Sequence, residues 1–222
     1  MPSVKIQKKS TVTDMTPFVD VAFLILTFFI MATKFKPPEP VEITTPSSVS
    51  SAKLQEDDVV LITMDKNNKV YFSASVASPQ DQGIIDDIIQ TANKEQNLNL
   101  SPEEMANFRK TFSIGVPFNQ VKSLLATPAD QQKNLAQPGI PVDTTGGQLT
   151  YWIQYAKQAF AGKRLNYLIK GDNNAKFPTF DNVIAALKRN DQFKYNLITS
   201  PEEAPAGTEL YKERHSDKKT SK

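Results

Sequence analysis

Asp20 is the residue whose surroundings most need a chemical explanation. It lies inside the only long apolar run of the chain, residues 18–32. A charged side chain near the centre of a membrane helix costs about 2.5–3.5 kcal/mol on insertion scales, so an intramembrane carboxylate usually has a function. Burial favours the neutral form of a carboxyl group, which brings both of its protonation states within reach. The sequence therefore favours a single-span membrane protein that handles protons.

The helix that must position Asp20 is predicted over residues 15–34. Its first 19 residues contain no other charge, and at 1.5 Å per residue they reach about 28 Å, just enough to span a membrane. Pro17 suits the first turn of a helix, and the prolines at 37–38 prevent its continuation. Thr27 lies two turns beyond Asp20 on the same face, so its hydroxyl joins the candidate proton relay.

Three other interpretations of this apolar run stay open. Asp20 is a passive boundary residue if it lies close enough to the membrane surface for its carboxylate to reach water. Residues 5–33 are alternatively a cleaved signal peptide, although the acidic residue and the lack of an A-x-A cleavage site argue against it. The run 21–32 also has the length of a buried helix in a soluble protein. Lysines are equally numerous on both sides of the span, so charge does not orient it.

The composition excludes several classes of function. The 26 basic and 24 acidic residues leave a net charge of +2, which gives no excess positive field for nucleic acid. The chain has no cysteine, and its single histidine, His215, falls in the polar C-terminal tail. Disulfides, thiolate sites, a catalytic triad and a histidine-based metal site in a folded core are therefore not expected. We predict no enzymatic activity, because no convincing acid–base pair stands out, and no cofactor.

The chain beyond the apolar run has the pattern of an α+β domain, predicted over residues 58–200. Alternating apolar residues between polar turns indicate strands, and an apolar period of three to four indicates a helix. Strands are predicted at residues 59–65, 69–73, 165–170 and 195–199, and a helix at 180–188. The last strand, helix and strand along the chain form a βαβ unit. We expect a mixed sheet with helices on one face.

A long helical insertion, residues 76–164, separates the two halves of this domain. Its helices are predicted at residues 84–92, from the capping-box sequence Ser101–Glu104 onward, at 118–125 and at 152–160. Trp152 and Tyr155 are interpreted as core residues of the last of these helices. The insertion adds area without recognisable chemistry, so we interpret it as a docking surface for a divergent partner. The alternative is a helical subdomain without a binding role.

Two polar segments flank the domain. Residues 35–57, rich in proline and serine, are predicted to form an extended linker, and residues 201–222 a disordered tail. Within the linker, Val41, Ile43 and Thr45 belong to a stretch of alternating polarity. We predict that this stretch adds as an edge strand to a partner or to a second copy of the chain; a solvated spacer is the alternative.

Residues 14–21, Asp-Met-Thr-Pro-Phe-Val-Asp-Val, followed by the apolar stretch, resemble the ExbD/TolR family of biopolymer-transport proteins. Asp14, Thr16 and Pro17 match its membrane motif. The resemblance extends to residues 41–46, which look like the family's extended segment outside the membrane, and to the predicted hairpin. It implies a cytoplasmic N-terminus at residues 1–14, one transmembrane helix and a periplasmic domain, anchored in the bacterial inner membrane. The long insertion departs from the family pattern.

The resemblance also implies partners and a mechanism. Members of the family form a dimer inside a ring of a polytopic membrane protein, ExbB or TolQ, and use the proton-motive force to drive a TonB- or TolA-type protein. By this resemblance Asp20 is the proton-carrying carboxylate, and the partners are an ExbB/TolQ-like protein, a TonB-like protein, a second copy and protons. The TonB-linked role is preferred. The alternatives are a TolR-like envelope-integrity motor subunit and a passive membrane-anchored periplasmic binding module.

Overall fold

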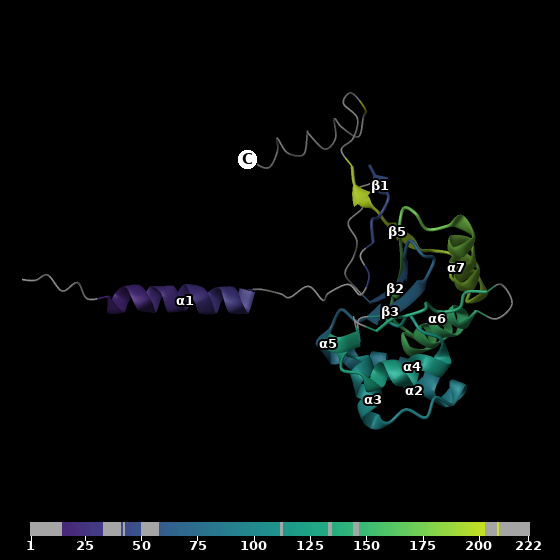
Figure 1. Cartoon of the computed structure of the whole chain (residues 1–222), viewed down its shortest axis with the longest axis horizontal. Helices are drawn as coiled ribbons and strands as arrows, with labels where there is room; N and C mark the ends of the chain where they lie inside the picture. The colour runs from purple at the N-terminus through teal and green to yellow at the C-terminus, as the bar shows by residue number, and fades with distance from the viewer. Residues whose placement is uncertain are drawn as a thin grey trace, which may run out of the picture. The chain divides into compact units, whose positions relative to one another are not determined.

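The computed structural model describes residues 15–32, 41, 43–49, 58–111, 113–132, 135–143, 147–202 and 208. The chain divides into two compact units, Met1–Pro38 and Glu39–Lys222 (Figure 1). Asp14 of the predicted membrane motif, the end of the predicted 15–34 helix and most of the 201–222 tail lie outside the described residues.

The described part of the first unit is one helix, α1 (Thr16–Ala32). Pro17 lies in its first turn, where its missing N–H costs no hydrogen bond. The large apolar side chains of α1 point into solvent: Phe18 is 71 % exposed and Ile30 is 64 % exposed. Among the described residues, no helix combines the length and the apolar character that crossing a membrane requires.

Four strands of the second unit form a mixed sheet in the order β3-β2-β4-β5. They are β2 (Val59–Met64), β3 (Val70–Ser75), β4 (Asn166–Gly171) and β5 (Asn196–Ile198). β2 pairs antiparallel with β3 and parallel with β4, and β4 pairs parallel with β5. The predicted hairpin and mixed sheet are therefore confirmed.

The hairpin turn between β2 and β3 is held by its own side chains. Asp65 Oδ1 accepts hydrogen bonds from the backbone N–H groups of Asn67 and Lys69, each at 2.8 Å. Asn68 has a φ of 64°, a left-handed conformation that asparagine tolerates better than most residues. This local chemistry explains why the hairpin is recognisable in the sequence.

The helices of the second unit are η1 (Pro79–Asp81), α2 (Gln82–Gln96), α3 (Pro102–Phe108), α4 (Phe118–Ala126), α5 (Ala129–Gln132), α6 (Gln148–Ala159) and α7 (Phe177–Arg189). Five of them, α2, α3, α4, α6 and α7, match predicted helices, whereas the short η1 and α5 were not predicted. The predicted capping box is present at the start of α3, since Ser101 Oγ accepts from Glu104 N–H and Glu104 accepts from Ser101 N–H. α7 connects β4 to β5, which confirms the βαβ unit.

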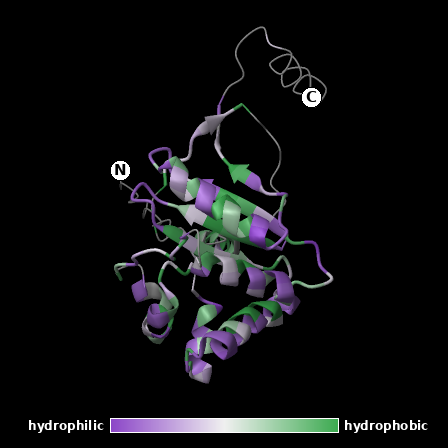
Figure 2. Cartoon of the chain, turned by 90° about the vertical axis from the view of Figure 1, so that its right-hand side faces the viewer, coloured by the Kyte–Doolittle hydropathy of each residue, from purple (hydrophilic) through white to green (hydrophobic). Residues whose placement is uncertain are grey.

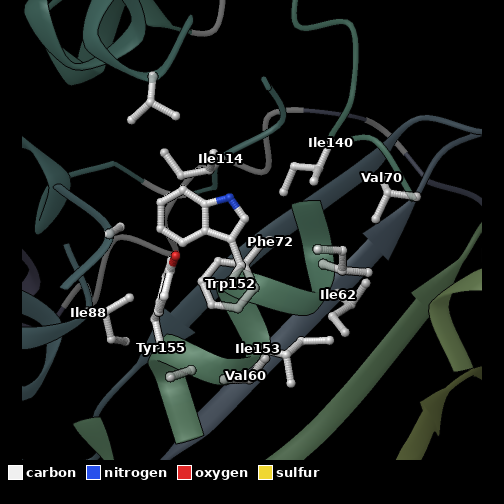
Figure 3. Close-up of a cluster of buried hydrophobic side chains, with 14 of the residues drawn as sticks. Val60, Ile62, Val70, Phe72, Ile88, Ile114, Ile140, Trp152, Ile153 and Tyr155 are labelled. Atoms are coloured by element: carbon white, nitrogen blue, oxygen red, sulfur yellow. The ribbon is translucent and has the colours of Figure 1, made fainter. Parts of the chain in front are cut away.

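One hydrophobic core joins the sheet to the helices, and Trp152 of α6 lies at its centre (Figure 3). The Trp152 ring is fully buried, 5.5 Å from the Phe72 ring of β3 and 5.3 Å from the Phe118 ring of α4, measured between centroids. Tyr155 is also fully buried, so both residues are core residues as predicted. Figure 2 shows hydrophobic and hydrophilic residues interleaved along the helices, as expected for helices that cover a single core.

The insertion also covers part of the outer edge of β3. Phe72 and Ile114 exchange two backbone hydrogen bonds, with N–O distances of 2.8 and 2.7 Å. Ile140 N–H donates to the Val70 carbonyl at 2.8 Å. Because unpaired strand edges are templates for unwanted pairing, this cover protects one side of the sheet.

Candidate functional site

Asp20 has no partner within the described part of the chain. Its carboxylate is exposed, and no hydrogen bond or ion pair reaches it from the described residues. Helical geometry places Thr16 one turn before Asp20, and Phe23 and Thr27 beyond it, on the same face. A shallow hollow on α1 is lined by Met15, Thr16, Val19, Asp20 and Phe23. Groups that complement the carboxyl must therefore come from outside this helix.

Thr27 uses its hydroxyl proton within α1. Its Oγ1 donates to the Leu24 carbonyl at 2.9 Å, so the oxygen lone pairs are what it offers to other groups. Asp20 and Thr27 are seven residues apart, which is about 10.5 Å along the helix axis. Their side chains share a face, but a proton passing between them needs intermediate groups.

The segment 43–49, inside the predicted linker, is bound to the domain of its own chain. Its strand β1 (Ser47–Ser48) pairs parallel with β6 (Ser200–Pro201). Ser200 N–H donates to the Pro46 carbonyl at 2.9 Å, and the hydroxyls of Thr45 and Ser200 are hydrogen-bonded at 2.6 Å. All three predicted docking residues, Val41, Ile43 and Thr45, are half-buried, and Thr45 is hydrogen-bonded within its own chain. Docking to another chain stays a prediction.

Asp172 anchors this segment at the end of β4. The side chain is only 7 % exposed. Its Oδ1 accepts from Asn174 N–H at 2.8 Å, and its Oδ2 accepts from Thr44 N–H at 3.1 Å. The Asn174 hydrogen bond is the main cause of a lowered pKa of Asp172, burial opposes it, and the Thr44 bond contributes in the same direction. Asp172 is not among the site residues predicted from the sequence. The signal that points to it is the Asp-Asn-Asn sequence directly after a predicted strand.

Asp65 and Asp172 occupy equivalent places at the ends of neighbouring parallel strands, because Met64 is paired with Gly171. Asp65 is 2 % exposed and is hydrogen-bonded within its own hairpin. Asp172 differs because one carboxylate oxygen binds a segment 128 residues away. The described residues contain no group of three His, Cys, Asp or Glu side chains placed to hold a metal, so both aspartates are read as hydrogen-bond anchors.

The described surface of the insertion is polar. Among the described residues between 76 and 164, two large apolar side chains are strongly exposed, Leu135 and Tyr151, each at 41 %. Apolar interaction sites normally need a contiguous exposed patch, and two such residues do not establish one. The predicted docking role of the insertion therefore receives no support from apolar area and stays a prediction.

The family model "Biopolymer transport protein ExbD/TolR" matches residues 7–202. The chain therefore belongs to the ExbD/TolR family, as the motif around Asp20 predicts. Comparison with curated proteins and with solved structures finds no match to the chain.

Proposed function

We propose that this chain is an ExbD-like subunit of an inner-membrane motor driven by the proton-motive force. Members of the family are biopolymer-transport motor subunits anchored in the inner membrane. In the proposal, α1 spans the membrane once, the domain lies in the periplasm, and Asp20 carries protons. The subunit works without catalytic turnover, cofactor or metal.

The observation that carries the proposal is one carboxyl group on a helix whose apolar side chains face outward. The exposed fractions of Phe18 and Phe28 are 71 % and 67 %, so the described part of its own unit does not cover the apolar side chains of α1. Its 17 residues lie at the lower limit of the roughly 17–25 that spanning helices use. The predicted span extends it to residue 34, beyond the described residues.

The proposed mechanism is a change in what Asp20 can face. The neutral carboxyl group tolerates an apolar surface, whereas the ionised form requires water or polar partners. Each proton crossing the membrane releases about 2.3 kcal/mol per 100 mV, enough to bias a rotation or tilt of α1. Because the Thr27 hydroxyl donates to the Leu24 carbonyl, its oxygen serves the proposed proton path as an acceptor. The other hydrogen-bonding groups of that path come from water or from the partner protein.

The proposed partners are those of the family. A polytopic ExbB/TolQ-like protein surrounds α1 and supplies hydroxyl groups near Asp20, and a second copy of the chain completes a dimer. A TonB-like protein receives the motion and energises transport across the outer membrane. The second candidate, a TolR-like subunit of an envelope-integrity motor, uses the same site with a TolA-type recipient.

The test replaces Asp20→Asn in the host and measures growth on a nutrient whose uptake is TonB-dependent. Asparagine keeps the shape and hydrogen bonding of aspartate but does not cycle a proton. We expect lost growth with unchanged protein level and unchanged co-purification of the polytopic partner. Asp65→Asn, in the hairpin turn of the domain, is the matched control and should grow.

Two other results separate the alternatives. Normal growth of the Asp20→Asn strain with lost resistance to envelope stress assigns the TolR-like role. Normal behaviour in both assays contradicts the proton relay and leaves a passive anchored binding module.

A further inference from the structure

One phenylalanine ring of the domain lies largely in water. The Phe177 side chain, at the start of α7, is 73 % exposed, the largest exposed fraction among the large apolar side chains of the described domain. Its ring contacts the ring of Phe180, one turn further along α7, with a centroid distance of 6.4 Å. Phe180 in turn packs against the core. Phe177 is therefore an apolar group supported at the surface, which forgoes the stabilisation of burial.

The residues around Phe177 are unusual for the start of a helix. Lys176 is the N-cap residue and makes no side-chain capping bond, and the first turn of α7 contains no acidic residue. Serine, threonine, aspartate and asparagine are the favoured N-caps, and a positive charge is unfavourable at this end of the helix dipole. Departures of this kind from local rules are typical of functional sites. The stability of α7 alone does not explain this sequence.

The hairpin turn after β2 lies against the start of α7. Asn68 Oδ1, in that turn, accepts from Lys176 N–H at 2.7 Å, and Phe177 is the next residue of the chain. Pro178 follows and is exposed, as is Lys176. The exposed ring therefore belongs to the end of the domain that the hairpin turn forms.

The linker is bound to the domain at this same end. Thr44 N–H donates to the Asp172 carboxylate at 3.1 Å, and the Thr44 carbonyl accepts from Asn173 N–H at 2.8 Å. Asp172 directly follows β4, and the pairing of Met64 with Gly171 places the turns after β2 and β4 next to each other. We define the linker end of the domain as residues 44, 65–69 and 172–178.

The linker end is nearly balanced in charge, so the aromatic ring is its most distinctive exposed group. It contains three lysines and two aspartates, and Asp181 of α7 follows one turn after Phe177. The two aspartates are buried and accept hydrogen bonds within their own turns. Lys176, next to the ring, is exposed. A lysine beside an apolar ring suits a membrane boundary, because its long side chain reaches the headgroups while the ring enters the apolar layer.

The covalent chain keeps the linker end close to an anchored α1. Thr44 follows Ala32, the last residue of α1, by twelve positions, and a chain of that length spans at most about 43 Å when fully extended. The opposite end of the domain lies farther along, since the 13 residues of α7 extend about 20 Å from Phe177 toward Phe193. The linker therefore favours contact between the membrane and the linker end.

We propose that Phe177 inserts into the surface of the bilayer that holds α1, with the linker end of the domain facing the lipid headgroups. The proposal rests on the proposed membrane anchor of α1 and adds a second, reversible contact with the same membrane. A phenylalanine that enters the apolar layer gains enough free energy to favour this orientation about tenfold. Lipid is preferred over a partner protein, because the linker holds this end of the domain near the bilayer.

The test uses tryptophan as the probe. Trp152 is the only tryptophan of the chain and is fully buried, so an introduced tryptophan reports on its own surroundings. The full chain carrying Phe177→Trp is reconstituted into phosphatidylcholine vesicles with brominated acyl chains, which quench tryptophan fluorescence on contact. The matched variant is Phe193→Trp, since Phe193 is 69 % exposed but lies beyond the other end of α7. We expect quenching and a shift to shorter wavelength in the first variant, and neither in the second.

A second measurement tests the phenylalanine ring itself. The chain has no cysteine, so Asn173→Cys at the linker end accepts a single fluorophore, and a headgroup-level quencher reports how close this end stays to the bilayer. Phe177→Ser should weaken the contact about tenfold, whereas Phe193→Ser should leave the quenching unchanged. Because the linker end is nearly balanced in charge, the quenching should persist at high salt.

Three results overturn the proposal. They are equal quenching of the two tryptophan variants, no quenching of either in chains that stay with the vesicles, and a shift of the Phe177→Trp fluorescence only after the polytopic partner is added, which assigns the ring to a protein contact. A chain that does not stay with the vesicles contradicts the membrane anchor instead. Asp20→Asn should leave the quenching unchanged, so failure of the proton relay is read separately.

Discussion

The two units of this chain use apolar residues in opposite ways. In α1 the phenylalanine side chains are exposed, with Phe18 at 71 % and Phe28 at 67 %, whereas in the domain Phe72 and Trp152 are fully buried. The domain buries most of its large apolar side chains, although Phe177 and Phe193 are 73 % and 69 % exposed. The large apolar side chains of α1 are exposed together, and at about 25 cal/mol per Å² this surface strongly favours contact with lipid or with partner helices.

The aspartates of the two units also differ in whether their own unit supplies hydrogen-bond donors to the carboxylate. Asp172 in the domain accepts hydrogen bonds from Asn174 and Thr44, and these hold it in its charged form. Asp20 receives no such bond from the described residues. The domain therefore supplies the hydrogen bonds of Asp172 and covers most of its own apolar side chains, while α1 depends on its surroundings for both its apolar and its acidic groups.

The largest expected effect separates the two units by stability. Trp152→Ala removes the ring at the centre of the core (Figure 3) and should cost about 3–5 kcal/mol. Phe18→Ala in α1, the matched control, should leave the unfolding midpoint of the domain unchanged. Urea unfolding of the chain followed by far-UV circular dichroism measures both. A similar loss from both substitutions would show that α1 packs on the domain core.

A second prediction concerns the stability of the domain at alkaline pH and tests whether its core tyrosines are buried. Burial raises the pKa of Tyr71, Tyr155 and Tyr167 to about 12, from an ordinary value of 10.0. Well below pH 10 these tyrosines are neutral in the folded and in the unfolded chain, so their ionisation does not change the free energy of unfolding. From pH 10 to 12 the unfolded state ionises first, and stability should fall. Urea midpoints measured across this pH range, at constant ionic strength, check the trend.

Two tyrosine substitutions sharpen this prediction. The Tyr167 hydroxyl has no hydrogen-bond partner among the described residues, so Tyr167→Phe should stabilise the domain by about 1 kcal/mol at pH 7. Tyr155→Phe removes a 2.8 Å bond from Gln96 and should destabilise it by about 1 kcal/mol. Both should reduce the alkaline loss. An unchanged alkaline midpoint in both variants would mean that these tyrosines do not cause it.

The smallest expected effect is local to the bound segment. Asp172→Asn removes the charge that accepts from Thr44 N–H, so hydrogen exchange at the Thr44 and Asn173 amides should become faster. Because the pKa of Asp172 is lowered in the folded state, this stabilisation is present above about 3.8 and is lost as the pH falls through the lower, folded value. Asp65→Asn, by contrast, should accelerate exchange at Asn67 and Lys69. Unchanged exchange at Thr44 would contradict the anchoring role of Asp172.

The sequence predicts the elements of this fold where local chemistry determines them. The hairpin follows from the Asp65–Asn68 turn, α3 from the capping box at Ser101, and the βαβ unit from two strand patterns that flank α7. Asp20 is predictable for a similar reason, since one charge interrupts an apolar run.

The contacts that pattern analysis misses join distant parts of the chain. The bond between Thr44 and Asp172 spans 128 residues, and the pairing of Ile114 with Phe72 involves an isolated residue without periodicity. Neither contact produces a periodic pattern within a short stretch of sequence. The polar linker and the insertion therefore reveal their intramolecular contacts only in the folded chain.

The central claim is tested most directly by proton flux. The chain and its polytopic partner are reconstituted together in vesicles that enclose a pH-sensitive dye, and an imposed membrane potential drives proton entry. The account predicts proton flux in the wild-type complex and flux at background level in the Asp20→Asn complex. The Asp172→Asn complex should show normal flux, because Asp172 lies in the domain and not in α1. Undiminished flux in an intact Asp20→Asn complex would contradict the assignment of Asp20 as the proton carrier.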